Sequence, residues 1–251
     1  MRYKALICDV DGTLITNSID ALPSKTIVNA ISHAKDKIHI GIATSRPIYL
    51  LTSILEKLDL SGPSILHGGA EIRDVKTGKI YFEELIPKKT ILTIYSIAKA
   101  NNLTLQLEQN GKLAPVTNAY VFKDIQGAVM IGVEPDRVNK IVEEINALHI
   151  VFPHKIPSWH KGKVDISITP IHATKQEGIQ RIAEVLEITT HEIIGVGDGY
   201  NDFPLLMACG LKVAMGNAVP ELKEIADYIA PTVEEDGVAD VIEKFVLNPQ
   251  L

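Results

Sequence analysis

The chain has 251 residues, 46% of them hydrophobic, which is enough for one large domain or two smaller domains with a substantial core. Its formal net charge of −6 excludes a strongly basic protein, and no Lys/Arg-rich run marks a nucleic-acid-binding surface. No apolar segment approaches the roughly 20 residues that span a bilayer, and no hydrophobic signal segment precedes Asp9. We expect a cytoplasmic globular protein, a monomer or homodimer, that binds neither nucleic acid nor membranes.

The first part of the chain alternates strands and helices, which is typical of a parallel sheet with helices on both faces. Apolar residues at positions 27, 30, 31 and 34 follow the spacing of an amphipathic helix. The predicted elements are, in chain order, a strand at 3–8, a helix near 27–34, a strand at 38–43, a helix near 50–58 and a strand at 64–67.

The middle of the chain has a different pattern. Alternating apolar and polar residues at 103–107 are typical of a sheet with one face open to water. The predicted elements are strands at 78–82, 103–107, 128–133 and 164–168, with helices near 88–101 and 136–148. We predict an inserted α+β domain at residues 83–168, large enough to fold on its own core.

The last part returns to the first pattern. The predicted elements are a helix at 175–186, a strand at 192–196, a short helix near 202–208, a strand at 211–215 and a helix near 238–246. Residues 1–82 and 169–251 are therefore predicted to form a doubly wound, mostly parallel α/β core.

Two carboxylates follow the first predicted strand directly, in the sequence Asp9-Val10-Asp11-Gly12. If the backbone is still extended there, the side chains of Asp9 and Asp11 point the same way and share one small space. Their repulsion would require a cation or a proton.

Two further features follow other predicted elements, and ligands of open α/β sheets bind at the carboxyl ends of the strands. Thr44 ends an apolar strand and could donate a hydrogen bond to an anion, although Thr before a helix is often only a cap. Lys175 stands at the N-terminus of a predicted helix, where the helix dipole makes a positive charge unfavourable. A bound anion nearby would explain its position. The alternative is a solvated surface lysine.

The remaining feature is the sequence GDGYND at residues 197–202. Tyr200 occupies the place of the last glycine of a dinucleotide-binding fingerprint, which excludes that motif. A plain turn rich in Gly, Asn and Asp is the alternative. A turn alone would not explain why two loops at strand ends, those with Asp9 and Asp198, are acidic.

Together these features indicate phosphoryl transfer. Asp9, Asp11 and Asp198 are oxygen ligands suited to Mg²⁺, whereas Thr44 and Lys175 suit phosphate oxygens. A carboxylate beside Mg²⁺ and a bound phosphate is a competent nucleophile, which predicts hydrolysis through an aspartyl-phosphate.

In this combination the chain resembles the haloacid dehalogenase (HAD) superfamily of phosphotransferases. Four motifs carry the resemblance, in order: DVDGT at residues 9–13, Thr44, Lys175 and GDGYND at residues 197–202. The sequence VAMGNA at residues 213–218 resembles the Cof-type branch, whose members are mostly sugar-phosphate phosphatases with an inserted α/β cap of the C2 type. Such a cap would close over the site and exclude water.

The resemblance implies a role for each motif residue. Asp9 would be the nucleophile, and Asp11 the general acid and then the base. The phosphate-binding set would be Thr44, Ser45, Lys175 and Asn201. Asp9, the carbonyl of Asp11 and Asp198 would hold Mg²⁺, with Asp202 supporting bound water or Lys175.

Two departures from the family pattern stand near the phosphate-binding set. Ser45 replaces the usual glycine, and HGGA at residues 67–70 replaces the common Asn-Gly-Ala loop. Substrate choice is expected to depend on the inserted domain, where His154, Trp159 and His160 are candidates for contact with the leaving group. The alternative is an exposed hairpin loop with Trp159 packed on its own domain.

The predicted function is therefore a Mg²⁺-dependent phosphatase of small phosphorylated metabolites, with sugar phosphates as the expected class. A phosphomutase and a dedicated phosphatase of the phosphoglycolate type stay open as alternatives. A phospho-aspartate signalling receiver is a third alternative, but receivers are single small domains, and neither Asp11 nor the insert fits one.

Overall fold

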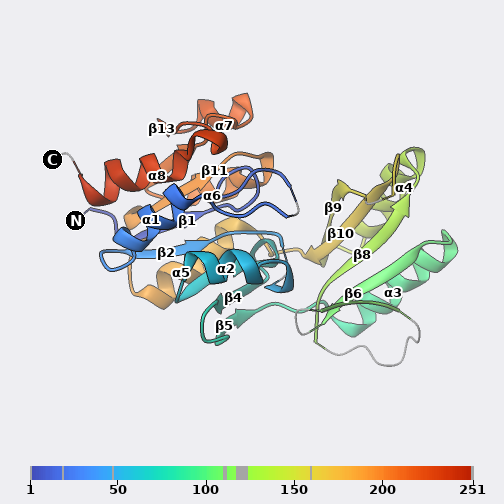
Figure 1. Ribbon diagram of the computed structural model, residues 1–251. Helices are drawn as coiled ribbons and strands as arrows, with labels where there is room; N and C mark the ends of the chain where they lie inside the picture. The colour runs from blue at the N-terminus through green and yellow to red at the C-terminus, as the bar shows by residue number, and fades with distance from the viewer. Residues whose placement is uncertain are drawn as a thin grey trace. The chain divides into compact units, whose positions relative to one another are not determined.

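The computed structural model describes residues 2–18, 20–46, 48–109, 112–116, 124–158 and 160–249. The chain forms two compact units, the first made of Met1–Phe82 with Thr174–Leu251 and the second of Glu83–Ala173 (Figure 1). The chain returns to the first unit after Ala173, later than the predicted boundary at 168 and 169. That boundary falls inside strand β10 (Val164–Pro170), which still pairs with β9 at Pro170 and so belongs to the second unit.

The first unit is built on a five-stranded sheet in the order β13-β12-β11-β1-β2. Every strand pair in it is parallel. The strands are β1 (Ala5–Cys8), β2 (His39–Ile42), β11 (Ile193–Gly197), β12 (Leu211–Ala214) and β13 (Tyr228–Ile229). All residues of β1 are buried, which explains why this strand reads as an unbroken apolar run.

The helices of the first unit connect parallel strands. The connection from β1 to β2 and the connection from β11 to β12 run in opposite directions along the sheet. Because such connections are right-handed, α1 of the first connection and α6 of the second lie on opposite faces of the sheet. Accordingly α1 contacts α8, whereas α6 contacts α5 (Figure 1). The helices are α1 (Lys25–Ala34), α2 (Thr52–Leu58), α5 (Lys175–Leu186), α6 (Phe203–Ala208), α7 (Pro220–Glu224) and α8 (Gly237–Ile242), which continues as a π-helical turn, Glu243–Leu247.

The third predicted strand has a different neighbour than expected. β3 (Pro63–Leu66), β4 (Glu71–Asp74) and β5 (Ile80–Glu83) form a separate three-stranded sheet, in which β3 and β4 are antiparallel. A β-bridge between Ala43 and Ile65 links this sheet to the chain at the end of β2. The pattern of apolar residues marked β3 as a buried strand but carried no information about its partner.

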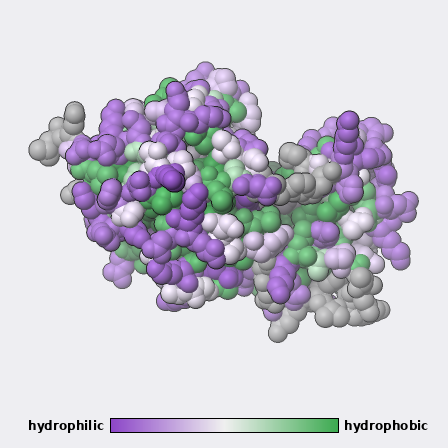
Figure 2. All heavy atoms as spheres, in the orientation of Figure 1, coloured by the Kyte–Doolittle hydropathy of each residue, from purple (hydrophilic) through white to green (hydrophobic). Residues whose placement is uncertain are grey.

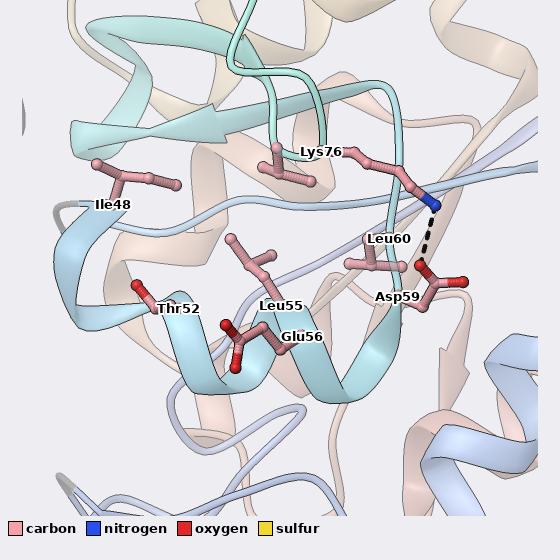
Figure 3. Close-up of a pocket in the computed structure, with 8 residues that line it drawn as sticks. Ile48, Thr52, Leu55, Glu56, Asp59, Leu60 and Lys76 are labelled. Carbon is pink, nitrogen blue, oxygen red and sulfur yellow. Dashed lines mark hydrogen bonds and ion pairs between the residues drawn. The ribbon is translucent and has the colours of Figure 1, made fainter.

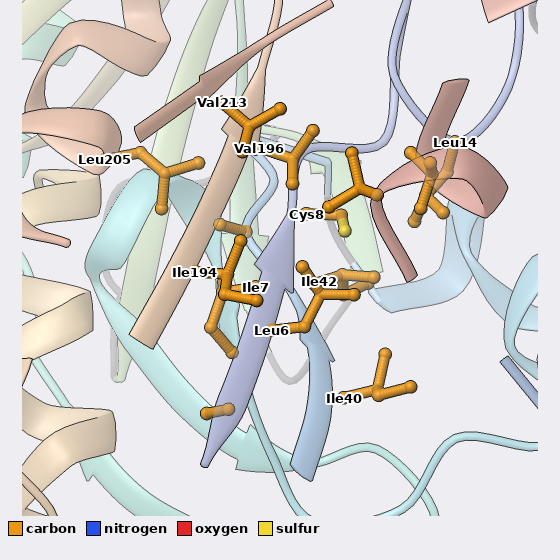
Figure 4. Packing of buried hydrophobic residues seen from close by; sticks show 14 of the residues in the cluster. Leu6, Ile7, Cys8, Leu14, Ile40, Ile42, Ile194, Val196, Leu205 and Val213 are labelled. Atoms are coloured by element: carbon orange, nitrogen blue, oxygen red, sulfur yellow. The ribbon is translucent and has the colours of Figure 1, made fainter. Parts of the chain in front are cut away.

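The core of the first unit surrounds β1. Side chains of Leu6 and Ile7 on β1 lie beside Ile194 and Ile42 of the neighbouring strands (Figure 4). All four are fully buried. This packing holds the carboxyl ends of β1, β2 and β11 in a fixed register, and the polar loops begin at those ends.

The second unit contains a five-stranded sheet in the order β7-β6-β8-β10-β9 with antiparallel pairs. One apolar cluster includes residues of its strands and of its two helices. The elements are α3 (Lys88–Ala100), β6 (Thr104–Gln109), β7 (Lys112–Pro115), β8 (Ile125–Val133), α4 (Pro135–Asn146), β9 (Val151–Pro157) and β10 (Val164–Pro170). The strand β9 was not among the predicted strands, because its mixture of Pro, His and Lys does not show the alternation of apolar and polar residues that is typical of a strand.

Hydrophilic side chains are interspersed with hydrophobic ones on the face shown in Figure 2. Within the described part of the chain, no helix combines the length and the apolar character needed to cross a membrane.

Candidate active site

Three carboxylates meet where β1 and β11 end. The two strands are parallel neighbours, and the backbone N–H of Asp9 donates to the carbonyl of Val196 at 2.9 Å. Asp9, Asp198 and Asp202 each offer an oxygen atom within 4.8 Å of the others. The parallel register therefore brings together the first and the last sequence motifs.

Lys175 lies in the middle of this acidic cluster. Its Nζ donates to Oδ1 of Asp9 and to Oδ1 of Asp202, each at 2.5 Å, and its side chain is only 2% exposed. The alternative of a solvated surface lysine is therefore wrong. The position follows from local structure, because Thr174 caps α5 by accepting a hydrogen bond from the N–H of Glu177, which fixes Lys175 in the first turn.

Asp202 is fully buried and uses both of its carboxylate oxygens. Oδ1 binds Lys175, while Oδ2 accepts hydrogen bonds from the backbone N–H of Asp198 at 3.0 Å and of Gly199 at 2.9 Å. Asp202 thus holds both the lysine and the turn that presents Asp198. The turn is therefore more than a surface loop, because the buried carboxylate of Asp202 accepts hydrogen bonds from the turn's own backbone.

The loop after β1 wraps closely around Asp198. Gly12 has a positive φ of 77°, and a Cβ there would lie 2.2 Å from Oδ2 of Asp198, so only glycine fits without displacement. Thr13 is buried, and its Oγ1 donates to Oδ1 of Asp198 at 2.9 Å. Asn217 donates from Nδ2 to the carbonyl of Gly12 at 2.8 Å and accepts at Oδ1 from the N–H of Val233. These contacts connect the loop after β1 to the segments that follow β12 and β13.

Asp11 has a partner that was not predicted. Arg46 donates from Nε to Oδ2 of Asp11 at 2.9 Å and from Nη2 to Oδ1. Strand β1 ends at Cys8, and the carboxylate of Asp11 is not a member of the group formed by Asp9, Asp198 and Asp202. In this structure the carboxylate of Asp11 pairs with Arg46, and the expectation that Asp9 and Asp11 share one space stays a prediction.

The predicted phosphate-binding residues differ in exposure. Thr44 is buried, and its Oγ1 accepts a hydrogen bond from the N–H of Arg46 at 3.0 Å. This contact lies within the loop after β2 and does not cap a helix, because the N-cap residue of α2 is Leu51; the hydroxyl proton of Thr44 is still available for donation to a ligand. Ser45 and Asn201 are exposed, Ser45 in the bend after Thr44 and Asn201 in a short 3-10 turn, Tyr200–Asp202.

The electrostatics of the cluster favour a bound cation. Burial raises the pKa of Asp9 to about 8, an effect that Asp202 and Asp198 reinforce and Lys175 opposes. Burial also raises the pKa of Asp198 to about 6. Burial alone would lower the pKa of Lys175, but Asp202 and Asp9 outweigh it and raise that pKa. Three carboxylates around one ammonium leave an excess of two negative charges when all are ionised, which a divalent cation would neutralise.

The candidates in the second unit lie on different elements. His154 is on the edge strand β9, with Nε2 3.2 Å from Oγ1 of Thr169 and its ring 4.8 Å from that of Phe152. His160 follows in the loop, where its N–H donates to Oγ of Ser158 at 3.1 Å. Trp159 lies outside the described residues.

A separate surface pocket of about 360 Å³ lies beside α2 (Figure 3). Leu55, Leu60 and Val75 contribute its apolar walls, and Lys76 Nζ donates to Oδ1 of Asp59 at 3.0 Å along its rim. None of its lining residues is a predicted site residue. The pocket therefore does not extend the acidic cluster.

Comparisons with known proteins agree with this arrangement. A model of the haloacid dehalogenase-like hydrolase family matches residues 6–123 and 118–242. A provisionally named phosphatase of Streptococcus pyogenes is 29% identical, with 99% of this chain and 100% of that protein covered. The 5-amino-6-(5-phospho-D-ribitylamino)uracil phosphatase YcsE of Bacillus subtilis is 27% identical, with 97% of this chain and 96% of that protein covered.

Among solved structures, a subclass IIB sugar phosphatase of the HAD superfamily superposes with a TM-score of 0.75 at 22% identity, covering 96% of this chain and 98% of that chain. A haloacid dehalogenase-like hydrolase from Bacteroides thetaiotaomicron gives a TM-score of 0.83 at 22% identity, with coverages of 96% and 98%. At these identities the likeness shows the fold.

The chain belongs to the haloacid dehalogenase-like hydrolase family, because the family model covers most of its length. Within that family it is a phosphatase of the Cof type, as its phosphatase relatives and its fold indicate. The predicted family, fold class and enzyme class are thus confirmed.

Three residues that position the site were not recognised from the sequence. They are Thr13, Arg46 and Asn217. Thr13 and Asn217 stand within sequence motifs and Arg46 lies two positions after Thr44, but only the folded chain reveals the partners of these three residues. The partner of Arg46 is 35 positions away, and that of Asn217 is 205 positions away.

Proposed function

We propose that this phosphatase hydrolyses small phosphorylated metabolites, sugar phosphates in particular, with Mg²⁺ and through an aspartyl-phosphate on Asp9. The observation that carries the proposal is the buried cluster in which Lys175 contacts Asp9 and Asp202 beside Asp198. The alternative, a phosphomutase, would share this cluster, but no feature of the described residues favours a phosphomutase over hydrolysis.

The residues present fit a hard divalent cation. Asp9 and Asp198 supply carboxylate oxygens, and their raised pKa values reflect burial together with mutual repulsion, which a cation would relieve. We assign Asp9, the carbonyl of Asp11 and Asp198 as the holders of Mg²⁺. Asp202 supports the site indirectly, because both of its oxygens are already engaged. When bound, Mg²⁺ would offset the charge of Asp9 and of the phosphoryl group and so permit the approach of two anions.

In the first step, the phosphoryl group binds to the hydroxyl of Thr44 and the ammonium of Lys175. An oxygen of Asp9 attacks phosphorus and forms an Asp9–phosphorus bond, while the bond from phosphorus to the leaving-group oxygen breaks. Asp11 donates a proton to that oxygen, and the dephosphorylated alcohol departs. Ser45 and Asn201 are exposed near these positions and are assigned to the rim of the phosphate site.

In the second step, Asp11 accepts a proton from water, and the water oxygen attacks the phosphorus of the aspartyl-phosphate. The bond to Asp9 breaks, inorganic phosphate leaves, and the carboxylate of Asp9 is restored. Asp11 returns to its protonated form and is ready for the next cycle. Arg46 orients Asp11 through two parallel hydrogen bonds.

Two named proteins support the substrate class. One relative acts on a phosphorylated ribityl chain, and one structural neighbour is a sugar phosphatase. We assign His154, Trp159 and His160 of the second unit as candidates for contact with the leaving group. His154 is exposed on the edge strand β9 beside the hydroxyl of Thr169, and an imidazole nitrogen is a group suited to sugar hydroxyls.

The test is phosphate release from a panel of sugar phosphates, sugar-alcohol phosphates, phosphoglycolate and an aryl phosphate, with Mg²⁺ or with EDTA. We expect turnover only with Mg²⁺, and none in Asp9→Asn. Acid-quenched protein should carry a phosphate that hydroxylamine releases, since acyl phosphates react with that nucleophile. Asp36→Asn is the matched control, because Asp36 is an exposed carboxylate at the opposite end of β2 from Thr44.

Full turnover in EDTA would refute the assignment of Mg²⁺, and full turnover by Asp9→Asn would refute the covalent route. Transfer of phosphate to a second sugar without release to water would replace the phosphatase by a phosphomutase. A preference for phosphoglycolate over every sugar phosphate would identify the dedicated phosphatase instead.

A further inference from the structure

The segment from Ile65 to Gly69 lies between the two residues assigned to the phosphoryl group. The N–H of Thr44 donates to the carbonyl of Ile65 at 3.0 Å, and the N–H of Gly68 donates to the carbonyl of Thr44 at 2.9 Å. Both backbone polar groups of Thr44 are therefore held by this segment. A shift of this segment would therefore also shift the buried hydroxyl of Thr44.

The same segment also contacts the start of α5, which carries Lys175. A Cβ on Gly69 would lie 2.1 Å from the carbonyl oxygen of Thr174, the cap residue directly before Lys175. One turn further along α5, Gly178 packs so closely on Ile65 that a Cβ there would lie 2.7 Å from its side chain. The helix therefore rests on the segment at two places.

The backbone of the segment is unusual. Three successive residues have positive φ: His67 at 51°, Gly68 at 69° and Gly69 at 124°. A left-handed conformation costs little for glycine, and among other residues Asn, Asp and His adopt it most readily. His67 is also buried, at 3% exposure, although it stands at a sharp turn. Such a strained conformation persists only where the surrounding structure enforces it, and it is concentrated at functional sites.

We propose that the turn His67–Gly69 is the positioning element of the phosphoryl-binding pair, which fixes the spacing between Thr44 and Lys175, and that Gly69 is the residue that sets this spacing. The turn itself touches neither substrate nor metal in this scheme; it acts through the backbones of Thr44 and Thr174. The proposal rests on the proposed function, because it takes Thr44 and Lys175 as the phosphoryl ligands.

The test is the affinity of the folded protein for inorganic phosphate in the presence of Mg²⁺, measured by calorimetry, together with kcat and KM for a sugar phosphate. In Gly69→Ala the new Cβ must displace Thr174, so the phosphate Kd should rise by about tenfold or more, and kcat/KM should fall by about 100-fold. If the turn has only a structural role, Gly69→Ala should lower the melting temperature but leave the phosphate Kd and kcat/KM unchanged at temperatures well below melting.

Gly78→Ala is the matched control. Gly78 also has a positive φ, of 77°, in the same unit, but a Cβ there would meet no atom within 4 Å. Both substitutions put a side chain on a residue with positive φ, but only Gly69→Ala brings that side chain against Thr174. Gly78→Ala should lower the melting temperature and keep the wild-type phosphate Kd.

Two further variants keep the proposal testable if Gly69→Ala does not fold. His67→Gly permits the left-handed conformation but makes the backbone of the turn more flexible, so it should raise the phosphate Kd. It leaves the contact between Gly69 and Thr174 without an added Cβ. His67→Asn preserves the conformational preference and should keep the Kd within about twofold of wild type.

Folded Gly69→Ala or His67→Gly with a wild-type phosphate Kd would overturn the proposal. Failure of the proposed function would look different, since wild-type protein would then neither release nor bind phosphate. Wild-type binding of phosphate without turnover would refute the phosphatase steps and still leave the turn testable through Kd.

Discussion

Arg46 donates two hydrogen bonds to the carboxylate of Asp11, from Nε to Oδ2 at 2.9 Å and from Nη2 to Oδ1. The arginine is largely buried, with 14% of its side chain exposed, whereas Asp11 is 37% exposed. A planar guanidinium fixes a carboxylate in position and in orientation, which a lysine cannot do. The residue assigned to proton transfer is therefore held by the loop that also carries Thr44.

Replacing Arg46 should affect proton donation to the leaving group. In Arg46→Gln we expect kcat for a sugar phosphate to fall by about 100-fold, the lower end of general acid–base catalysis. The loss should be smaller for an aryl phosphate, because an aryl oxide leaves without much protonation. Arg46→Lys should not restore activity.

The measurement is kcat for both substrates in each variant. Arg181→Gln is the control, because Arg181 pairs with Glu184 at 3.1 Å on the exposed surface of α5. An equal loss for sugar and aryl phosphates would contradict a role in positioning the proton donor.

Mg²⁺ should stabilise the protein more at high pH than at low pH. The pKa of Asp198 is raised from 3.8 to about 6 in the folded protein. Without metal, the protonated form of Asp198 therefore contributes stability below its unfolded pKa. That stability is lost as the pH rises through the folded pKa. Asp9, raised to about 8, extends this loss to higher pH. Since Mg²⁺ requires the ionised carboxylates, its effect grows over the same range.

The measurement is the melting temperature with EDTA and with Mg²⁺ at about pH 5 and about pH 8, on either side of the Asp198 pKa. The gain from Mg²⁺ should be larger at the higher pH in wild type and absent in Asp198→Asn. The idea fails if the gain is the same at both pH values.

Thr13 should control the affinity for the metal. Its Oγ1 donates to Oδ1 of Asp198 and orients that carboxylate. Thr13→Val keeps the shape but removes the donor, so the Mg²⁺ concentration for half-maximal activity should rise by about tenfold. Thr13→Ser should preserve it.

Thr93→Val provides the comparison, since the hydroxyl of Thr93 donates to a backbone carbonyl on an exposed face of α3. A wild-type Mg²⁺ requirement in Thr13→Val would show that the hydroxyl does not orient Asp198.

Asn217 should contribute to stability rather than to chemistry alone. It donates to the carbonyl of Gly12 and accepts from the N–H of Val233, so Asn217→Ala leaves two partly buried backbone groups without these bonds. We expect the free energy of unfolding to fall by about 1–3 kcal/mol, as measured by urea denaturation. Asn139→Ala, which removes an exposed hydrogen bond to Lys155, should change it little. A negligible effect of Asn217→Ala would mean that water replaces both bonds.

Helix α5 illustrates what could be read from the sequence. Its predicted span, 175–186, is the span observed. Thr174 supplies the cap, and Ile179, Ile182 and Ala183 form the buried stripe. These are local signals, because capping and amphipathic spacing involve residues within a few positions of one another.

Strands β9 and β3 illustrate what could not be read. His154 and Lys155 on β9 gave the segment the composition of a loop, and only pairing with β10 makes it a strand. β3 was recognised as a strand, but its antiparallel partner β4 was missed. Strand pairing depends on a second segment of the chain, so the composition and periodicity of one segment do not specify its partner.

By itself the sequence determined the family, the order of its four motifs and the chemistry available to them, because residue types and local spacing carry that information. Only the tertiary structure decided which side chains meet. Lys175 lies 166 positions from Asp9 in the chain, yet its Nζ is 2.5 Å from the Asp9 carboxylate. Asp11, two positions from Asp9, pairs instead with Arg46. The register of parallel strands and the packing of buried helices create these distances, and neither is encoded within a single motif.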